Sequence, residues 1–97
     1  MSATFLRIPV DPILLFLWEQ EQRHAARRAP WAWWWRYEDI PAITEAMPEG
    51  TSEEDARAVM KYLLDKDLVM GCICGCRGDF ELSIAGRDRV YELLEEA

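Results

Sequence analysis

Apolar residues recur at helical spacing between residues 51 and 66, and this pattern predicts an amphipathic α-helix. The apolar stripe comprises Ala56, Val59, Met60, Leu63 and Leu64. Two capping boxes are available at its start, Thr51 with Glu54 or Ser52 with Asp55. Acidic residues fill positions 53–55, where they complement the positive end of the helix dipole.

The hydrophobic period changes from helical spacing to two after residue 67, which predicts a β-hairpin. Apolar residues alternate over residues 68–74 and 80–84, and a glycine-containing turn, GCRGD, joins the two runs. Ser83 is expected to cap a last helix. That helix should bury Val90, Leu93 and Leu94.

The first half of the chain predicts two more helices with a strand between them. Asp11 followed by Pro12 is a start signal for a helix that runs to about Arg28. Residues 13–18 are apolar on nearly every side, so this helix should be buried on two faces. A second helix is expected from Glu38 to about Met47, with a proline in its first turn. The predicted fold class is therefore α+β, in the order helix, strand, helix, helix, hairpin, helix.

The strand between these helices is unusually rich in tryptophan, with four in five residues. A regular strand would direct Trp31, Trp33 and Trp35 to one side and Trp34 to the other. Three interpretations remain open. Three rings would fill the core while the fourth is half exposed, the rings could anchor a protein partner or a second copy, or they could stack on nucleic-acid bases. The candidate partner or dimer interface comprises Phe16, Trp18, Trp31, Trp33, Trp34 and Trp35.

The segments YLLDKDLVMG and FELSIAGRDRVYELLEE resemble the end of a winged-helix domain. That family pattern is a helix closing in Leu-Leu-x-x-x-Leu-Val, then a wing, then Leu-Ser/Thr-x-x-Gly-Arg and a closing helix. The matching positions are Tyr62, Leu63, Leu64, Asp67, Leu68, Val69, Leu82, Ser83, Gly86 and Arg87. The resemblance covers roughly residues 37–96 and implies a small winged helix-turn-helix domain. Residues 1–97 are expected to form one domain, with an arm, the first helix and the start of the tryptophan-rich strand in residues 1–36.

The resemblance also implies a DNA-facing surface, because such domains place their third helix in the major groove and their wing on the flanking DNA. The candidate DNA-binding residues are Ser52, Arg57, Ala58, Lys61 and Tyr62, with Arg77 at the wing tip. A small transcriptional regulator is the favoured function. It would act as a dimer through the first helix and the tryptophan segment.

The distribution of charge weakens this expectation. Residues 1–36 carry five arginines and three carboxylates, a net +2, whereas residues 37–97 carry six basic and fifteen acidic residues, a net −9. The half expected to meet DNA would on average be repelled by it. The alternative is an acidic protein-interaction module, an adaptor or a DNA-mimicking inhibitor, that does not bind DNA. The basic patch Arg23, Arg27 and Arg28 is either a solvated helix end or a contact for phosphates or an acidic partner.

Candidate chemistry is sparse. Cys72, Cys74 and Cys76 occupy alternate positions, roughly 6.5–7 Å apart on a strand, which is too far for tight chelation unless Gly75 bends the chain. Two small core residues and one wing thiol are favoured over a metal or redox site. The chain has one histidine and no catalytic motif, so no enzyme, cofactor, metal or small-molecule substrate is expected. The odd cysteine count and the absence of an apolar run of ~18 residues favour a cytoplasmic protein without membrane contact.

Overall fold

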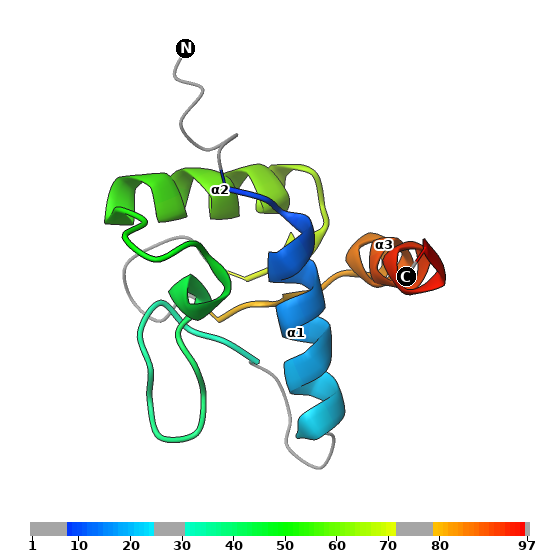
Figure 1. Cartoon of the computed structure of the whole chain (residues 1–97), viewed down its shortest axis with the longest axis horizontal. Coiled ribbons are helices and arrows are strands. Elements are labelled where there is room, and N and C mark those ends of the chain that lie inside the picture. Colours follow the sequence, from blue (N-terminus) through cyan, green and yellow to red (C-terminus); the bar gives the residue numbers. More distant parts are fainter. Residues whose placement is uncertain (1–7, 25–30, 72–78, 97) are drawn as a thin grey trace.

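Helix α1 (Asp11–Arg23) lies between the other elements, and this position explains why its first turns are apolar on nearly every side. The computed structural model describes residues 8–24, 31–71 and 79–96. Within them Ile13, Leu14 and Leu17 are fully buried. Helix α3 (Ile84–Glu96) packs along one side of α1, while the 3-10 helix η2 (Ile43–Ala46) and strand β2 (Glu81–Leu82) also contact it (Figure 1). The expected burial of α1 on two faces is confirmed.

Both ends of α1 differ from the sequence-based expectation. The helix begins at Asp11 with Val10 as its N-cap, and Asp11 makes no capping hydrogen bond. Its carboxylate instead accepts hydrogen bonds from Arg89 on α3 at 3.0 and 3.3 Å. The helix ends at Arg23 rather than near Arg28, and residues 25–30 lie outside the described residues.

Helix α2 (Glu53–Asp65) confirms the predicted amphipathic helix. Of the two capping boxes, the chain uses Ser52, whose hydroxyl accepts a hydrogen bond from the backbone N–H of Asp55 at 3.1 Å. The other candidate, Thr51, donates its hydroxyl proton to the Pro48 carbonyl oxygen at 2.6 Å. Ala56, Val59, Met60 and Leu63 are buried, and Leu64 is partly buried against them.

A helix over residues 38–47 does not form, and the prediction is wrong there. Tyr37 and Ile40 exchange two backbone hydrogen bonds of 2.9 Å around a turn in which Glu38 has a positive φ of 53°. Pro41 has no N–H to donate, and it disfavours helical backbone at the preceding residue. The next backbone groups pair with Trp33 instead, which leaves only η2 helical.

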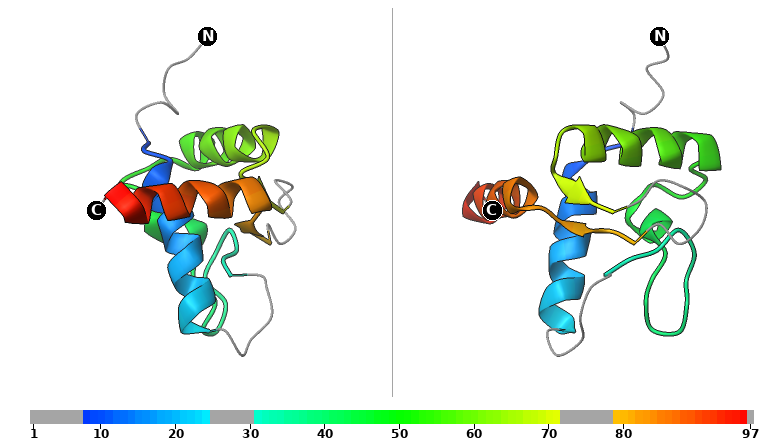
Figure 2. Two further views of the ribbon diagram at one scale, coloured as in Figure 1. Left: turned by 90° about the vertical axis from the view of Figure 1, so that its right-hand side faces the viewer. Right: turned by 180° about the vertical axis from the view of Figure 1, so that it is seen from behind.

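Strands β1 (Val69–Met70) and β2 form the predicted antiparallel hairpin, in the register Val69 to Leu82 and Met70 to Glu81. Both strands are shorter than expected within the described residues, and residues 72–78 lie outside them. The tryptophan-rich segment joins the hairpin through a single bridge from Ala32 to Phe80. Figure 2 shows this segment passing beside β2, at the edge of the hairpin that lies away from α2.

Helix α3 starts where Ser83 caps it, as predicted. The Ser83 hydroxyl accepts a hydrogen bond from the Gly86 N–H at 3.0 Å and donates one to the Asp67 carbonyl oxygen. Val90 is fully buried on the α1 side, but Leu93 is only partly buried and Leu94 is 42% exposed. The predicted burial of Leu94 is wrong because α3 packs against α1 and β2, and the end of α3 projects away from the other described elements (Figures 1 and 2).

A single core joins these elements. Its fully buried large side chains are Ile13, Leu14, Leu17, Ile43, Val59, Met60, Leu63, Val69, Phe80 and Val90. No helix in the described residues is both long enough and apolar enough to cross a lipid bilayer.

Candidate functional site: an indole pocket at the start of α2

The four clustered tryptophans do not alternate as a regular strand would require. Trp31 and Trp34 are buried, Trp33 is partly buried, and Trp35 is 51% exposed. The chain bends at residues 34 and 35, directly after the bridges at residues 32 and 33, so the side-chain alternation stops there. The structure therefore places two rings in the core, one partly buried and one half in solvent, whereas the core interpretation expected three in the core and one half exposed.

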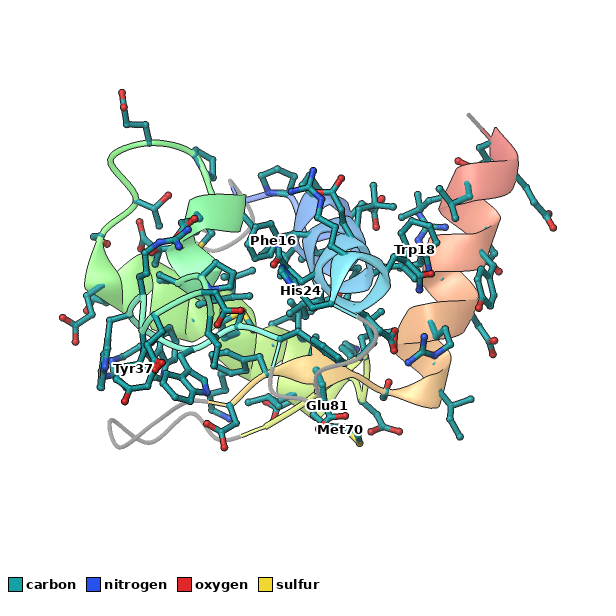
Figure 3. All side chains as sticks on the ribbon, turned by 90° about the horizontal axis from the view of Figure 1, so that it is seen from below. Phe16, Trp18, His24, Tyr37, Met70 and Glu81 are labelled. Carbon is teal, nitrogen blue, oxygen red and sulfur yellow. The ribbon has the colours of Figure 1, made fainter. Side chains whose placement is uncertain are left out.

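Trp34 is held between the core and the surface. Its ring meets the edge of Phe80 in a T-shaped contact with ring centroids 5.1 Å apart. Trp33 stacks on Tyr37 at 5.0 Å, and Tyr37 is 53% exposed. Figure 3 shows Tyr37 at the outer edge of the molecule, on the side away from α3. The segment therefore makes one aromatic contact with the core and a second that reaches solvent.

The loop that carries these rings is fixed by a bidentate ion pair. Arg36 donates hydrogen bonds to both carboxylate oxygens of Glu45, at 2.8 and 3.1 Å. The same carboxylate accepts the Ala42 N–H at 2.9 Å, so η2 is capped from within. The hydrogen bonds from Arg36 are the main reason that the pKa of Glu45 lies below its ordinary value.

A pocket of about 310 Å³ opens between this loop and the start of α2. It is lined by Trp34, Trp35, Thr44, Thr51, Glu53, Ala56 and Arg57. We call it the indole pocket. The loop supplies the two aromatic walls, η2 and the turn before α2 supply hydroxyls, and the first turns of α2 supply a carboxylate and a guanidinium.

Arg57 contacts both an aromatic wall and the carboxylate of the indole pocket. Its guanidinium lies 5.1 Å above the centre of the Trp34 ring, which is a cation–π contact. Its Nε donates a hydrogen bond to Glu53 at 3.2 Å, one helical turn earlier. Its side chain remains 38% exposed. The pocket therefore already holds a cation, contributed by the chain itself.

The other candidate DNA-binding residues on α2 are also engaged locally. Ser52 caps the helix, and Lys61 pairs with Asp65 at 3.0 Å. Tyr62 is partly buried, and the Lys66 ammonium lies 5.7 Å from its ring centre. Ala58 is partly buried, and Arg77 lies outside the described residues.

The remaining candidates from the sequence are dispersed. Phe16 and Trp18 are partly buried and pack against the monomer's own core, with Trp18 on the side of α1 that faces α3 and Phe16 on the side away from it (Figure 3). In the basic patch, Arg23 contacts Glu19 at 3.7 Å, while Arg27 and Arg28 lie outside the described residues.

Metal-ligating side chains do not gather in the described part of the chain. Residues 8–24, 31–71 and 79–96 contain no group of three or more His, Cys, Asp or Glu placed to hold a metal ion. The three cysteines considered in the sequence analysis, Cys72, Cys74 and Cys76, lie outside those ranges.

A second, shallower groove lies between the start of α1, the end of α2 and the middle of α3. Its volume is about 530 Å³, and an ion-pair chain of Asp11, Arg89 and Glu92 forms one wall. These two carboxylates raise the pKa of Arg89, so this guanidinium remains charged. The groove has no tryptophan among its described lining residues, whereas the indole pocket combines two indole rings with a carboxylate and a guanidinium.

Sequence analysis missed three residues of the indole pocket. Glu53 was assigned only to the helix dipole, although its i,i+4 spacing to Arg57 is a signal for an ion pair. Thr51 was considered only as a cap and Thr44 gave no signal, because only the fold brings η2 and the turn before α2 beside the tryptophans. No protein-family model matches the chain, and neither a curated protein nor a solved structure is significantly similar to it.

Proposed function

We propose that this chain is a winged-helix protein-interaction module, which uses the start of α2 and the indole pocket to bind a basic segment of a protein partner. The order of elements supports the winged-helix assignment. A helix, a bridged strand segment, η2, α2, the hairpin and a closing helix follow one another as in that layout, with η2 in the place of the second helix.

The net charge of α2 is the observation that favours a protein partner over DNA. The helix contains four carboxylates and two cations, a net −2. Both cations, Arg57 and Lys61, already pair with carboxylates of the same helix. A DNA phosphate would have to compete for these cations while approaching Glu53 and Glu54, and such an approach is repulsive.

The indole pocket adds an apolar element that suits a protein partner. Trp35 is half exposed at its wall, and the same loop carries a stacked pair, Trp33 and Tyr37, in which Tyr37 is exposed. Exposed Trp and Tyr beside a pocket are the residues that most often carry protein–protein binding energy. The surrounding carboxylates would steer a basic segment towards them.

Fluorescence anisotropy with two labelled probes tests the proposal, one a short arginine-rich peptide and the other a random-sequence DNA duplex, both at ~50 mM salt, where phosphate contacts are strongest. The full chain should bind the peptide and leave the duplex free. Glu54→Lys, at the start of α2, should weaken peptide binding several-fold, because it reverses a charge beside the pocket. Glu96→Lys makes the same charge change at the exposed end of α3 and is the matched control.

A DNA-binding regulator acting as a dimer is the second candidate, favoured by the resemblance to winged-helix domains and by the exposed position of α2 on the outside of the molecule (Figure 1). Duplex binding that falls steeply with salt and is lost in Arg57→Ala would overturn the protein-binding proposal in its favour. Size-exclusion chromatography with light scattering on the same samples would show whether a dimer binds.

A further inference from the structure

We propose that the indole pocket is a binding site for an arginine side chain of the partner, and that Arg57 covers its Trp34 wall as an intramolecular substitute until the partner binds. This inference rests on the proposed function and specifies its ligand. The observation behind it is the placement of Arg57: the chain's own guanidinium lies on the Trp34 ring and binds Glu53 inside a pocket that remains open to solvent.

The walls of the pocket match a guanidinium group. An indole face attracts a cation through its quadrupole, and a carboxylate at its edge accepts the N–H groups. Trp34 and Glu53 provide this pair, and half-exposed Trp35 provides a second indole at the mouth. The volume of about 310 Å³ is near the lower end of the range of ligand pockets, as a single side chain requires.

The charge around the pocket favours a cation over an anion. Glu53, Glu54 and Asp55 form the first turn of α2, and together they exceed the roughly half positive charge of a helix N-terminus. Among the described residues that line the pocket, Arg57 is the one cation, and Glu53 partly neutralises it. An acidic or phosphorylated partner segment would meet these carboxylates before it reached Arg57.

Displacement of Arg57 is feasible because its contacts are partly exposed. Its side chain is 38% exposed and that of Glu53 is 80% exposed, and ion pairs this exposed contribute little to stability. A partner arginine could stack on Trp35 as well as Trp34, since both rings line the pocket. Arginine should be preferred to lysine because its planar group stacks on indole and forks onto a carboxylate.

Isothermal titration calorimetry with three peptides of one sequence tests the inference, with arginine, lysine or neutral citrulline at the central position. The arginine peptide should bind about three- to tenfold more tightly than the lysine peptide, and the citrulline peptide should bind most weakly. Trp35→Ala should weaken arginine-peptide binding at least about fivefold. Tyr91→Ala removes a ring that is equally exposed, at 49%, on α3 and should leave binding unchanged.

Arg57→Ala is the decisive variant, because it removes the guanidinium that covers the Trp34 ring. It should strengthen binding of the arginine peptide about threefold or more. Lys61→Ala removes the same charge from the same helix outside the pocket and controls for the general electrostatic gain, so its effect should be smaller. Far-UV circular dichroism confirms that each variant keeps its helices.

The outcomes separate the two proposals. Equal binding of the arginine and lysine peptides, unaffected by Trp35→Ala and Arg57→Ala, would overturn the arginine site and leave the acidic binding surface standing. Failure of the wild-type chain to bind any basic peptide would overturn the proposed function itself. Binding of a phosphopeptide that Arg57→Ala abolishes would overturn the inference in favour of an anion site.

Discussion

The cations of α2 and the arginines of α3 make the same kind of bond over very different distances along the chain. On α2, Arg57 and Lys61 each pair with a carboxylate four residues away on the same helix. On α3, Arg87 reaches Glu21 and Arg89 reaches Asp11, so both arginines join α3 to α1. The separations along the chain are 66 and 78 residues.

This difference teaches which surface holds the fold together and which is available for binding. The bond from Arg87 to Glu21 is bidentate, at 2.5 and 2.7 Å, and the Glu21 side chain is only 20% exposed. Breaking it would weaken the packing of α3 against α1. The pairs on α2 join residues of one helix and connect it to no second element. A partner can therefore replace them with little loss of stability.

Among the substitutions proposed here, Gly86→Ala should destabilise the packing of α3 most strongly. A Cβ at Gly86 would lie 1.9 Å from the Leu68 carbonyl oxygen, which is backbone and cannot rotate away. We expect the free energy of unfolding to fall by about 3 kcal/mol, measured by urea denaturation. Ala85→Ser, on the exposed side of the same turn, should change it by less than about 0.5 kcal/mol. An unchanged midpoint for Gly86→Ala would show that α3 does not need this close approach.

Glu21→Gln should have the next largest effect. It keeps the shape of the side chain but removes the charge from a partly buried bidentate pair, so the free energy of unfolding should fall by about 1.5–2 kcal/mol. Asp65→Asn makes the matched change to the Lys61 pair on α2 and should cost about 0.5 kcal/mol or less. Equal losses in the two variants, by thermal or urea unfolding, would contradict the division into holding and exchangeable pairs.

Glu45→Gln should have the smallest effect on stability. It tests the ion pair with Arg36 that fixes the loop carrying the tryptophans. The pKa of Glu45 is lowered in the folded protein, mainly by the hydrogen bonds from Arg36, from an ordinary value of 4.5. Its contribution to stability is therefore present above pH 4.5 and is lost as the pH falls through the lower folded pKa.

Since this pair is largely exposed, the variant should lose about 0.5–1 kcal/mol at neutral pH and nothing further in acid. Denaturation curves from about pH 7 to about pH 3 measure this difference. Glu49→Gln, an exposed glutamate in the turn before α2, is the control. A difference between Glu45→Gln and wild type that persists in acid would assign the role to packing rather than charge.

The motif that resembles winged-helix domains acquires a physical explanation from the structure. Ser83 caps α3 and binds the Asp67 carbonyl oxygen, Gly86 lets the helix approach Leu68, and Arg87 pairs with Glu21. The sequence predicted the cap, because a serine before an apolar helix is a local signal. It gave no sign of the ion pair to α1, because the two residues are 66 positions apart.

The candidate site was predictable only in part. The tryptophan segment and Arg57 were singled out by composition and by the resemblance, but as parts of two different surfaces. The structure brings Trp34 and Arg57 into contact, and it places Thr44 and Thr51 beside them. No pattern within a short window encodes such a meeting, because it depends on how the loop and η2 pack against α2.

The sequence by itself determined the α+β class, the amphipathic α2 with its cap, the hairpin and the start of α3, since each follows from the period of apolar residues and a nearby capping side chain. Only the tertiary structure decided that residues 38–42 are not helical, which tryptophans are buried, and where Asp11 binds. In each of these cases a backbone group, an indole ring or a carboxylate can bind either a neighbour in the sequence or a distant residue. Which contact forms depends on how the whole core packs.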